Sequence, residues 1–118
     1  MHATKNICQS IRNAKSLLKE NGILLLNEMC GNNFFAHMTF GMLEGWWIYQ
    51  DTYLRIEGCP GIYKNTWKNI LLSEGFDSVY FPYDVNYDAK QEIIISKSNG
   101  IIYRNKMIDE YNNFSESQ

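Results

Sequence analysis

The amino-acid sequence predicts an α/β fold that forms the carboxyl-terminal half of a mostly parallel, doubly wound sheet. Helical and strand-like segments alternate along the 118 residues. The run 23–26 is apolar on both faces, as is typical of an interior parallel strand. The first helical segment follows no strand, although each helix of such a sheet normally does. We therefore expect part of a larger domain, with three main strands and about three helices.

Composition indicates a folded protein and excludes several classes of function. Apolar residues make up 45% of the chain, which suffices for a core in a domain of this size. The net charge of −2 offers no basic surface to nucleic acid or to an anionic membrane. No apolar run approaches the roughly 20 residues of a membrane helix, and the polar first residues do not form a signal peptide. The sequence predicts a cytoplasmic protein with no nucleic-acid or membrane partner.

Three cysteines bear on the compartment and on metal binding. Cys8, Cys30 and Cys59 are odd in number and show no CxxC spacing. This pattern favours three reduced, partly buried thiols in a cytoplasmic protein. We expect no metal site.

The first helix is expected over residues 6–20, where apolar residues recur with helical spacing. Asn6 or Thr4 can cap its start, and Gln9 is placed for a capping-box contact to Asn6. Asn21 and Gly22 both tolerate a left-handed backbone, so they are a suitable end.

The middle of the chain predicts a strand, a helix and a long connection. The apolar run 23–26 is the strand, and a second helix is expected from Phe34 to about Leu43. Residues 44–61 have no clean period and contain three glycines, one proline and four aromatic residues, so we interpret them as a structured loop or lid.

The last third predicts a helix and two or three strands. Asn65 or Thr66 would begin a third helix that Gly75 ends. Strands are expected at 76–81 and 92–96, and the turn residues at 98–100 allow a short antiparallel return strand at 101–103. We place the domain at 1–107 and a polar tail or linker at 108–118.

Two polar residues are the candidates for chemistry. Ligands of open α/β sheets bind beyond the carboxyl ends of the strands. His2 would follow a strand that precedes the chain, and Glu28 ends the strand that begins at Ile23. Since neighbouring strands lie roughly 4.8 Å apart, the two side chains could meet. Glu28 would then fix the tautomer of His2, and His2 would act as a general base. A surface histidine and a surface or helix-end carboxylate are the alternatives.

Three more residues have open interpretations. Trp46 and Trp47 lie in the lid, where one could pack on the core while the other closes a pocket, and core packing of both is the alternative. Asn27 could hold a substrate carbonyl or satisfy backbone groups.

Three segments together resemble the C-methyltransferase domains of modular polyketide synthases. They are HATKNICQSIRNAKSLLKENGILLLNEM, FFAHMTFGMLEGWW and CPGIYKNTWKNILLSEGFDSVYF, and they extend the resemblance from His2 to about Gly100. The HAT segment, the LLLNE strand end, the LEGWW lid and the TW helix occur in the order of the family. These domains are class I methyltransferases that use S-adenosylmethionine.

The resemblance implies a sheet in which the last strand is antiparallel and lies between the other two. It implies methylation of the α-carbon of a β-ketoacyl chain on an acyl carrier protein, with His2 as the base and Glu28 as its partner. Asn27 and the lid residues Phe40, Leu43, Trp46 and Trp47 would bind the substrate.

The resemblance also implies what this chain lacks. The glycine-rich cofactor loop and the acidic residue for the ribose belong to the other half of the domain, so only Ala3 and Thr4 could lie near the cofactor. We therefore expect a fragment that is inactive alone and that can self-associate through an exposed sheet edge. The alternative is a non-catalytic pseudo-methyltransferase scaffold in a polyketide synthase.

Overall fold

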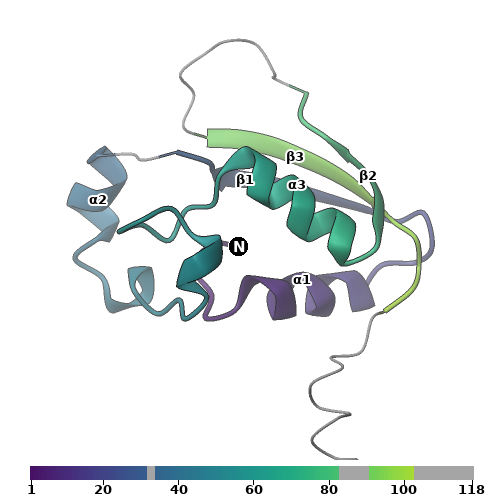
Figure 1. The fold of residues 1–118 in the computed structure, drawn as a ribbon, viewed down its shortest axis with the longest axis horizontal. Helices are drawn as coiled ribbons and strands as arrows, with labels where there is room; N and C mark the ends of the chain where they lie inside the picture. Colours follow the sequence, from purple (N-terminus) through teal and green to yellow (C-terminus); the bar gives the residue numbers. More distant parts are fainter. Residues whose placement is uncertain (32–33, 83–90, 103–118) are drawn as a thin grey trace, which may run out of the picture.

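The computed structural model describes residues 1–31, 34–82 and 91–102. The helices and strands are α1 (Ile7–Ser16), β1 (Ile23–Met29), α2 (Phe34–Phe40), α3 (Lys64–Ser73), β2 (Phe76–Tyr80) and β3 (Gln91–Ser98) (Figure 1). Two short 3-10 turns, η1 (Glu44–Trp46) and η2 (Thr52–Leu54), lie in the segment interpreted as a lid.

The three strands form one sheet in the order β1-β3-β2. Strand β3 is antiparallel to both neighbours, so β1 and β2 run in the same direction. Leu26 faces Ile94 across the β1–β3 ladder. The expected central, antiparallel last strand is confirmed.

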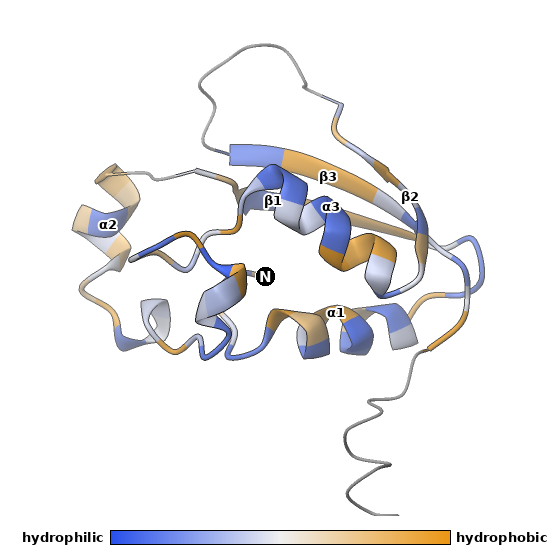
Figure 2. Cartoon of the chain, in the orientation of Figure 1, coloured by the Kyte–Doolittle hydropathy of each residue, from blue (hydrophilic) through white to orange (hydrophobic). Residues whose placement is uncertain are grey.

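The core lies between the sheet and two helices, α1 and α3, which pack on the same face of it (Figure 1). Ile7 and Ile11 of α1 meet Trp67 and Leu71 of α3 over the inner residues of the strands, such as Ile94. Figure 2 shows the apolar middle of β3. A second cluster beyond the end of β1 consists of Met29, Trp46, Ile56 and Cys59.

The opposite face of the sheet is exposed in the described part of the chain. Ile23 is 61% exposed and Leu25 is 62% exposed, whereas Leu26 is buried. The expectation of an interior strand buried on both faces is therefore wrong for β1 here. No described helix covers that face, and β1 pairs with β3 alone among the described residues.

Helix boundaries differ from the expected ones by a few residues. Asn6 caps α1 through its Oδ1, which accepts from the Gln9 backbone N–H at 3.0 Å. The Gln9 side chain donates to Asn13 instead of returning to Asn6, so the capping box is only half formed. Helix α1 ends at Ser16, before Asn21 takes the left-handed backbone with φ 62°.

The other two helices also differ in extent. Helix α2 ends at Phe40 instead of Leu43, and none of its residues is fully buried. Helix α3 begins at Lys64, with Tyr63 at its N-cap and no side-chain cap bond, one residue before the expected start.

The return strand is not present at Ile101 and Ile102, which have no regular structure, because β3 already has a neighbour on each side. Tyr103, the proposed tail and residues 83–90, which lie between the expected strands at 76–81 and 92–96, are outside the described residues. Within the described ranges, no helix is long and apolar enough to cross a membrane.

Candidate active site

His2 and Glu28 meet at the carboxyl end of β1. The Nδ1 atom of His2 lies 2.7 Å from Oε2 of Glu28, although 26 residues separate them in the sequence. The backbone N–H of His2 donates to the same oxygen at 3.3 Å, and the α-amine of Met1 donates to Oε1. Glu28 is only 2% exposed, and His2 is partly exposed. The structure thus brings together the two residues chosen from the sequence.

The environment of Glu28 keeps its side chain charged. Burial alone would raise the pKa of this carboxyl group, but the hydrogen bonds from His2 and from the Met1 amine, with the positive charge of that amine, outweigh burial, so the pKa is lowered. A carboxylate only accepts hydrogen bonds, so Nδ1 of His2 must be the donor. The second ring nitrogen, Nε2, then carries a lone pair that can accept a proton.

A cavity of about 590 Å³ opens beside the imidazole. Its walls come from the segment before α1, the end of β1, the start of β3, α2 and the lid. The lining residues are His2, Ala3, Asn27, Met29, Phe35, Ala36, Phe40, Leu43, Gly45, Trp46, Ile48 and Gln91. Most of these are apolar, which suits a ligand with a hydrocarbon part.

The two adjacent tryptophans have different surroundings. Trp46 is 6% exposed and lines the cavity. Its ring lies edge-on to the His2 imidazole at 5.8 Å and stacks on Phe40 at 5.9 Å. Trp47 is 49% exposed, does not line the cavity and donates from Nε1 to the Gly41 carbonyl at 2.8 Å. One tryptophan therefore packs against His2, and the other holds the backbone at Gly41.

The other five candidate residues also differ in whether they line the cavity. Asn27, Phe40 and Leu43 line the cavity, as expected of substrate-binding residues. Of the two residues expected near the cofactor, Ala3 lines the cavity and Thr4 does not. The Thr4 hydroxyl donates to the Met1 carbonyl at 3.1 Å, so it serves the local fold.

Known proteins resemble the chain over most of its length. It is 53% identical to polyketide synthase PksM of Bacillus subtilis over 104 residues, which are 88% of this chain and 2% of the synthase. It is 54% identical to polyketide synthase PksR of the same organism over 106 residues, which are 90% of this chain and 4% of the synthase. No protein-family model matches the chain.

A solved structure places this resemblance within one domain. The crystal structure of the DszA carbon methyltransferase superposes with a TM-score of 0.78 and 34% identity, over 86% of this chain and 27% of the methyltransferase chain. The chain is homologous to part of the C-methyltransferase domain of polyketide synthases. It spans about a quarter of the solved methyltransferase and a few per cent of the synthases it matches.

Several residues of this methyltransferase region line the cavity without having been chosen from the sequence. Gln91 stands at the start of β3, next to the end of β1, and Met29 is its register partner. Phe35 and Ile48 add apolar wall. The place of Gln91 in the cavity wall could have been predicted from the antiparallel central strand, because that topology brings the start of β3 to the carboxyl end of β1.

The three cysteines and His37 do not line the cavity. Cys8 and Cys30 are partly buried, Cys59 is buried, and all three are free thiols. In the described ranges, no three His, Cys, Asp or Glu side chains gather as metal ligands. His37 lies edge-on to Trp46 at 5.6 Å and does not line the cavity.

Proposed function

We propose that this chain supplies the general base and much of the acceptor pocket of a polyketide synthase C-methyltransferase. The reaction is transfer of a methyl group from S-adenosylmethionine to the α-carbon of a β-ketoacyl chain carried on an acyl carrier protein. The observation that carries the proposal is the His2–Glu28 pair at a mostly apolar cavity. Homology to carbon methyltransferases supports the reaction class.

The proposed step is removal of an α-proton by His2. The α-carbon between two carbonyl groups is acidic, so a neutral imidazole is a sufficient base. Nε2 takes the proton, and the electron pair of the C–H bond moves into the enolate. The imidazolium that forms is stabilised by the buried Glu28 carboxylate, 2.7 Å away. Glu28 also prevents the ring from turning, because it accepts both the side-chain and the backbone N–H of His2.

The cavity suits an acyl chain on a flexible carrier arm. Its volume of about 590 Å³ lies within the range of small-molecule sites. Phe40, Leu43 and Trp46 would contact the hydrocarbon part of the chain, and the Asn27 amide could donate to a carbonyl oxygen. The carrier would approach from the exposed side of the lid.

The described residues form only part of a site for S-adenosylmethionine. Among the residues that line the cavity there is no carboxylate to accept hydrogen bonds from ribose hydroxyls, and Ala3 is the expected cofactor neighbour that reaches the wall. When bound, the cofactor would supply the methyl group as an electrophile. The chemistry argued for this chain is therefore the proton abstraction and the shape of the acceptor pocket.

Substitution of His2 in the complete methyltransferase that carries this sequence tests the proposal. His2→Ala should lower methyl transfer to a β-ketoacyl carrier about 100-fold or more, because general-base catalysis contributes roughly 10²–10⁴. Binding of S-adenosylmethionine, measured by titration calorimetry, should stay nearly unchanged. His37→Ala is the matched control, since it also removes an imidazole packed on Trp46. Unchanged turnover of His2→Ala would remove His2 from the mechanism. A wild-type protein without turnover would favour the alternative of a non-catalytic pseudo-methyltransferase scaffold.

A further inference from the structure

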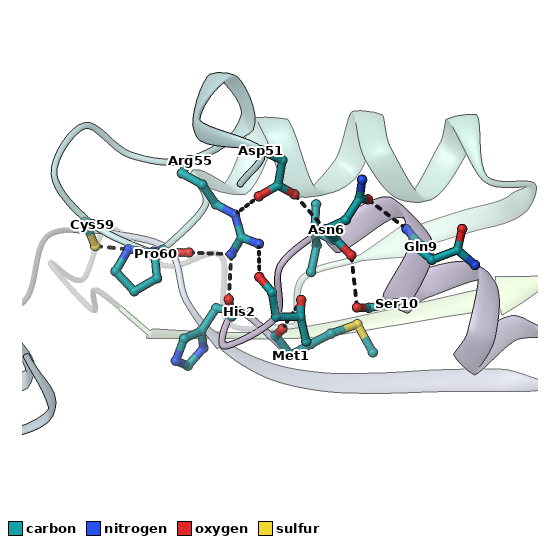
Figure 3. A network of polar contacts seen from close by, with 12 residues as sticks. Met1, His2, Asn6, Gln9, Ser10, Asp51, Arg55, Cys59 and Pro60 are labelled. Carbon is teal, nitrogen blue, oxygen red and sulfur yellow. Dashed lines mark hydrogen bonds and ion pairs between the residues drawn. The ribbon is translucent and has the colours of Figure 1, made fainter. Parts of the chain in front are cut away.

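A buried arginine lies directly behind the histidine. The Arg55 guanidinium donates through four of its N–H groups (Figure 3). Nη1 reaches the carbonyl oxygens of His2 at 2.6 Å and of Pro60 at 2.8 Å. Nη2 reaches the carbonyl oxygen of Thr4 at 2.9 Å, and Nε reaches Oδ1 of Asp51 at 2.8 Å. The side chain is fully buried, so these bonds do not compete with water.

The carbonyl groups that Arg55 holds belong to the segment that carries the imidazole. His2 and Thr4 lie in a stretch without regular secondary structure, before α1 begins at Ile7. Such a stretch has no ladder of backbone hydrogen bonds to fix it. Within it, a short turn from Thr4 N–H to the His2 carbonyl forms at 2.8 Å, and farther along, the Gln50 N–H donates to the Lys5 carbonyl at 2.8 Å. Arg55 adds the bonds that hold the carbonyl groups of His2 and Thr4 from the lid side.

Asp51 fixes both Arg55 and the start of α1. Its Oδ1 accepts from Arg55, and its Oδ2 accepts from the backbone N–H of Ile7 at 2.7 Å. The carboxylate satisfies an N–H group at the first turn of α1, where no intrahelical partner exists. Since Asp51 and Arg55 stand four residues apart across η2, the pair forms one rigid unit with the lid.

We propose that Arg55, held by Asp51, is a positioning residue for His2. It fixes the main chain that carries the imidazole, while Glu28 fixes the ring itself. The position of Nε2 against the substrate is then set from two sides. This inference rests on the proposed function of His2, but the positioning can be measured without turnover.

A purely structural role is the competing interpretation, and the chain offers a matched control for it. Arg12 donates to Glu74 through Nε at 2.7 Å and through Nη2 at 2.9 Å. This pair also links distant parts of the chain, α1 and the end of α3, and it is partly buried. In the described part of the chain, neither side chain forms a hydrogen bond or ion pair with residues 1–6, so Arg12→Lys should weaken the fold without moving His2.

The test compares Arg55→Lys with Arg12→Lys in two measurements. Lysine keeps the positive charge but lacks the planar fork that spans several carbonyl groups. In the complete methyltransferase, Arg55→Lys should lower kcat about 10- to 100-fold, the cost of a base misplaced by about 1 Å. KM for the β-ketoacyl carrier should change less than kcat, and Arg12→Lys should keep kcat within about twofold of wild type.

The second measurement follows the ring nitrogens of His2 by ¹⁵N NMR in the full chain. Wild type and Arg12→Lys should show one tautomer, protonated on Nδ1, and Arg55→Lys should show exchange between tautomers or ring orientations. If Arg55→Lys does not fold by circular dichroism, Asp51→Asn takes its place with the same expected direction. Wild-type kcat together with a wild-type ¹⁵N spectrum in the folded variant would overturn the inference. Such a result leaves the role of His2 intact, whereas unchanged turnover of His2→Ala removes that role whatever Arg55 does.

Discussion

Glu28 on β1 lies directly opposite Glu92 on β3 in the antiparallel ladder. Both side chains point to the inner face of the sheet, because Leu26 and Ile94, the next pair on that face, are both buried. Glu28 is compensated by His2 and the Met1 amine. The buried Oε2 of Glu92, in contrast, has no hydrogen-bond partner among the described residues. Two carboxyl groups therefore face each other, and Oε2 of Glu92 has no counterpart to the contacts that Glu28 makes.

Glu92→Gln should stabilise the chain. The substitution keeps the shape of the side chain and removes a like charge opposite Glu28, and cross-strand pairs of this kind contribute about 0.2–1 kcal/mol. Urea unfolding at pH 7 would measure the gain. Glu57→Gln, at an exposed lid position, is the control and should change stability little. A loss of stability in Glu92→Gln would mean that the Glu92 charge has a favourable partner.

Acid should destabilise the chain in part through Glu28. Because the pKa of Glu28 in the folded state is lowered below its ordinary value of 4.5, its contribution is present above that pH. The contribution is lost as the pH falls through the lowered value. At pH 7, Glu28→Gln should be about 1.5–3 kcal/mol less stable than wild type, the range for hydrogen bonds to charged groups.

The measurement for Glu28 is urea unfolding at pH 7 and again near pH 3. The gap between wild type and Glu28→Gln should narrow at the lower pH, since below 4.5 the carboxylate of the unfolded chain takes up a proton and the charged form favours the folded state less. An equal gap at both values would show that the carboxylate charge is not what stabilises the pair.

The sequence could predict the meeting of His2 and Glu28 because topology alone carries that information. The apolar run before Glu28 identifies a strand, and residues at the ends of neighbouring strands converge whatever the loops do. The resemblance to a known family supplied the antiparallel position of β3, which the model confirms.

The role of Arg55 could not be predicted in the same way. It lies in an aperiodic segment, where neither helical nor strand spacing says which residues face inward, and its four acceptors come from four separate positions. A charged residue in a loop is usually solvated, so composition alone suggests the opposite of its burial. The exposure of Leu25 was missed because a continuous apolar run does not tell whether both faces are covered by the same chain.

The two lid tryptophans should respond very differently to truncation. Trp46→Ala removes a buried ring that contacts His2 and Phe40, so it should cost about 3–5 kcal/mol of unfolding free energy. Trp47→Ala removes a half-exposed ring and one hydrogen bond to Gly41, and it should cost about 1 kcal/mol. Urea unfolding of the two variants compares them directly, and similar losses would contradict the division of roles described for the lid.

The Cys30 thiol should be nearly inert at neutral pH. Burial, together with the nearby Glu92 and Glu28 carboxylates, raises its pKa to about 12. At pH 8 only about one thiol in ten thousand would be a thiolate, against roughly a quarter for an ordinary cysteine. Iodoacetamide labelling followed by peptide mass spectrometry should find Cys30 unmodified in the native chain and modified rapidly in urea. Rapid native labelling of Cys30 would show that the site opens far more easily than its burial implies.

The exposed face of β1 should make the chain self-associate. One edge of β1 pairs with β3, the other edge has no partner among the described residues, and Ile23 and Leu25 present apolar surface beside it. An unpaired, apolar strand edge is a template for pairing with a second copy. Light scattering should therefore give a mass that rises with concentration, and Leu25→Lys should lower it by placing a charge on the contact face. Leu17→Lys is the control, because Leu17 is an exposed apolar residue at the end of α1 that belongs to no strand. A monomeric mass at every concentration would contradict self-association through the free edge of β1.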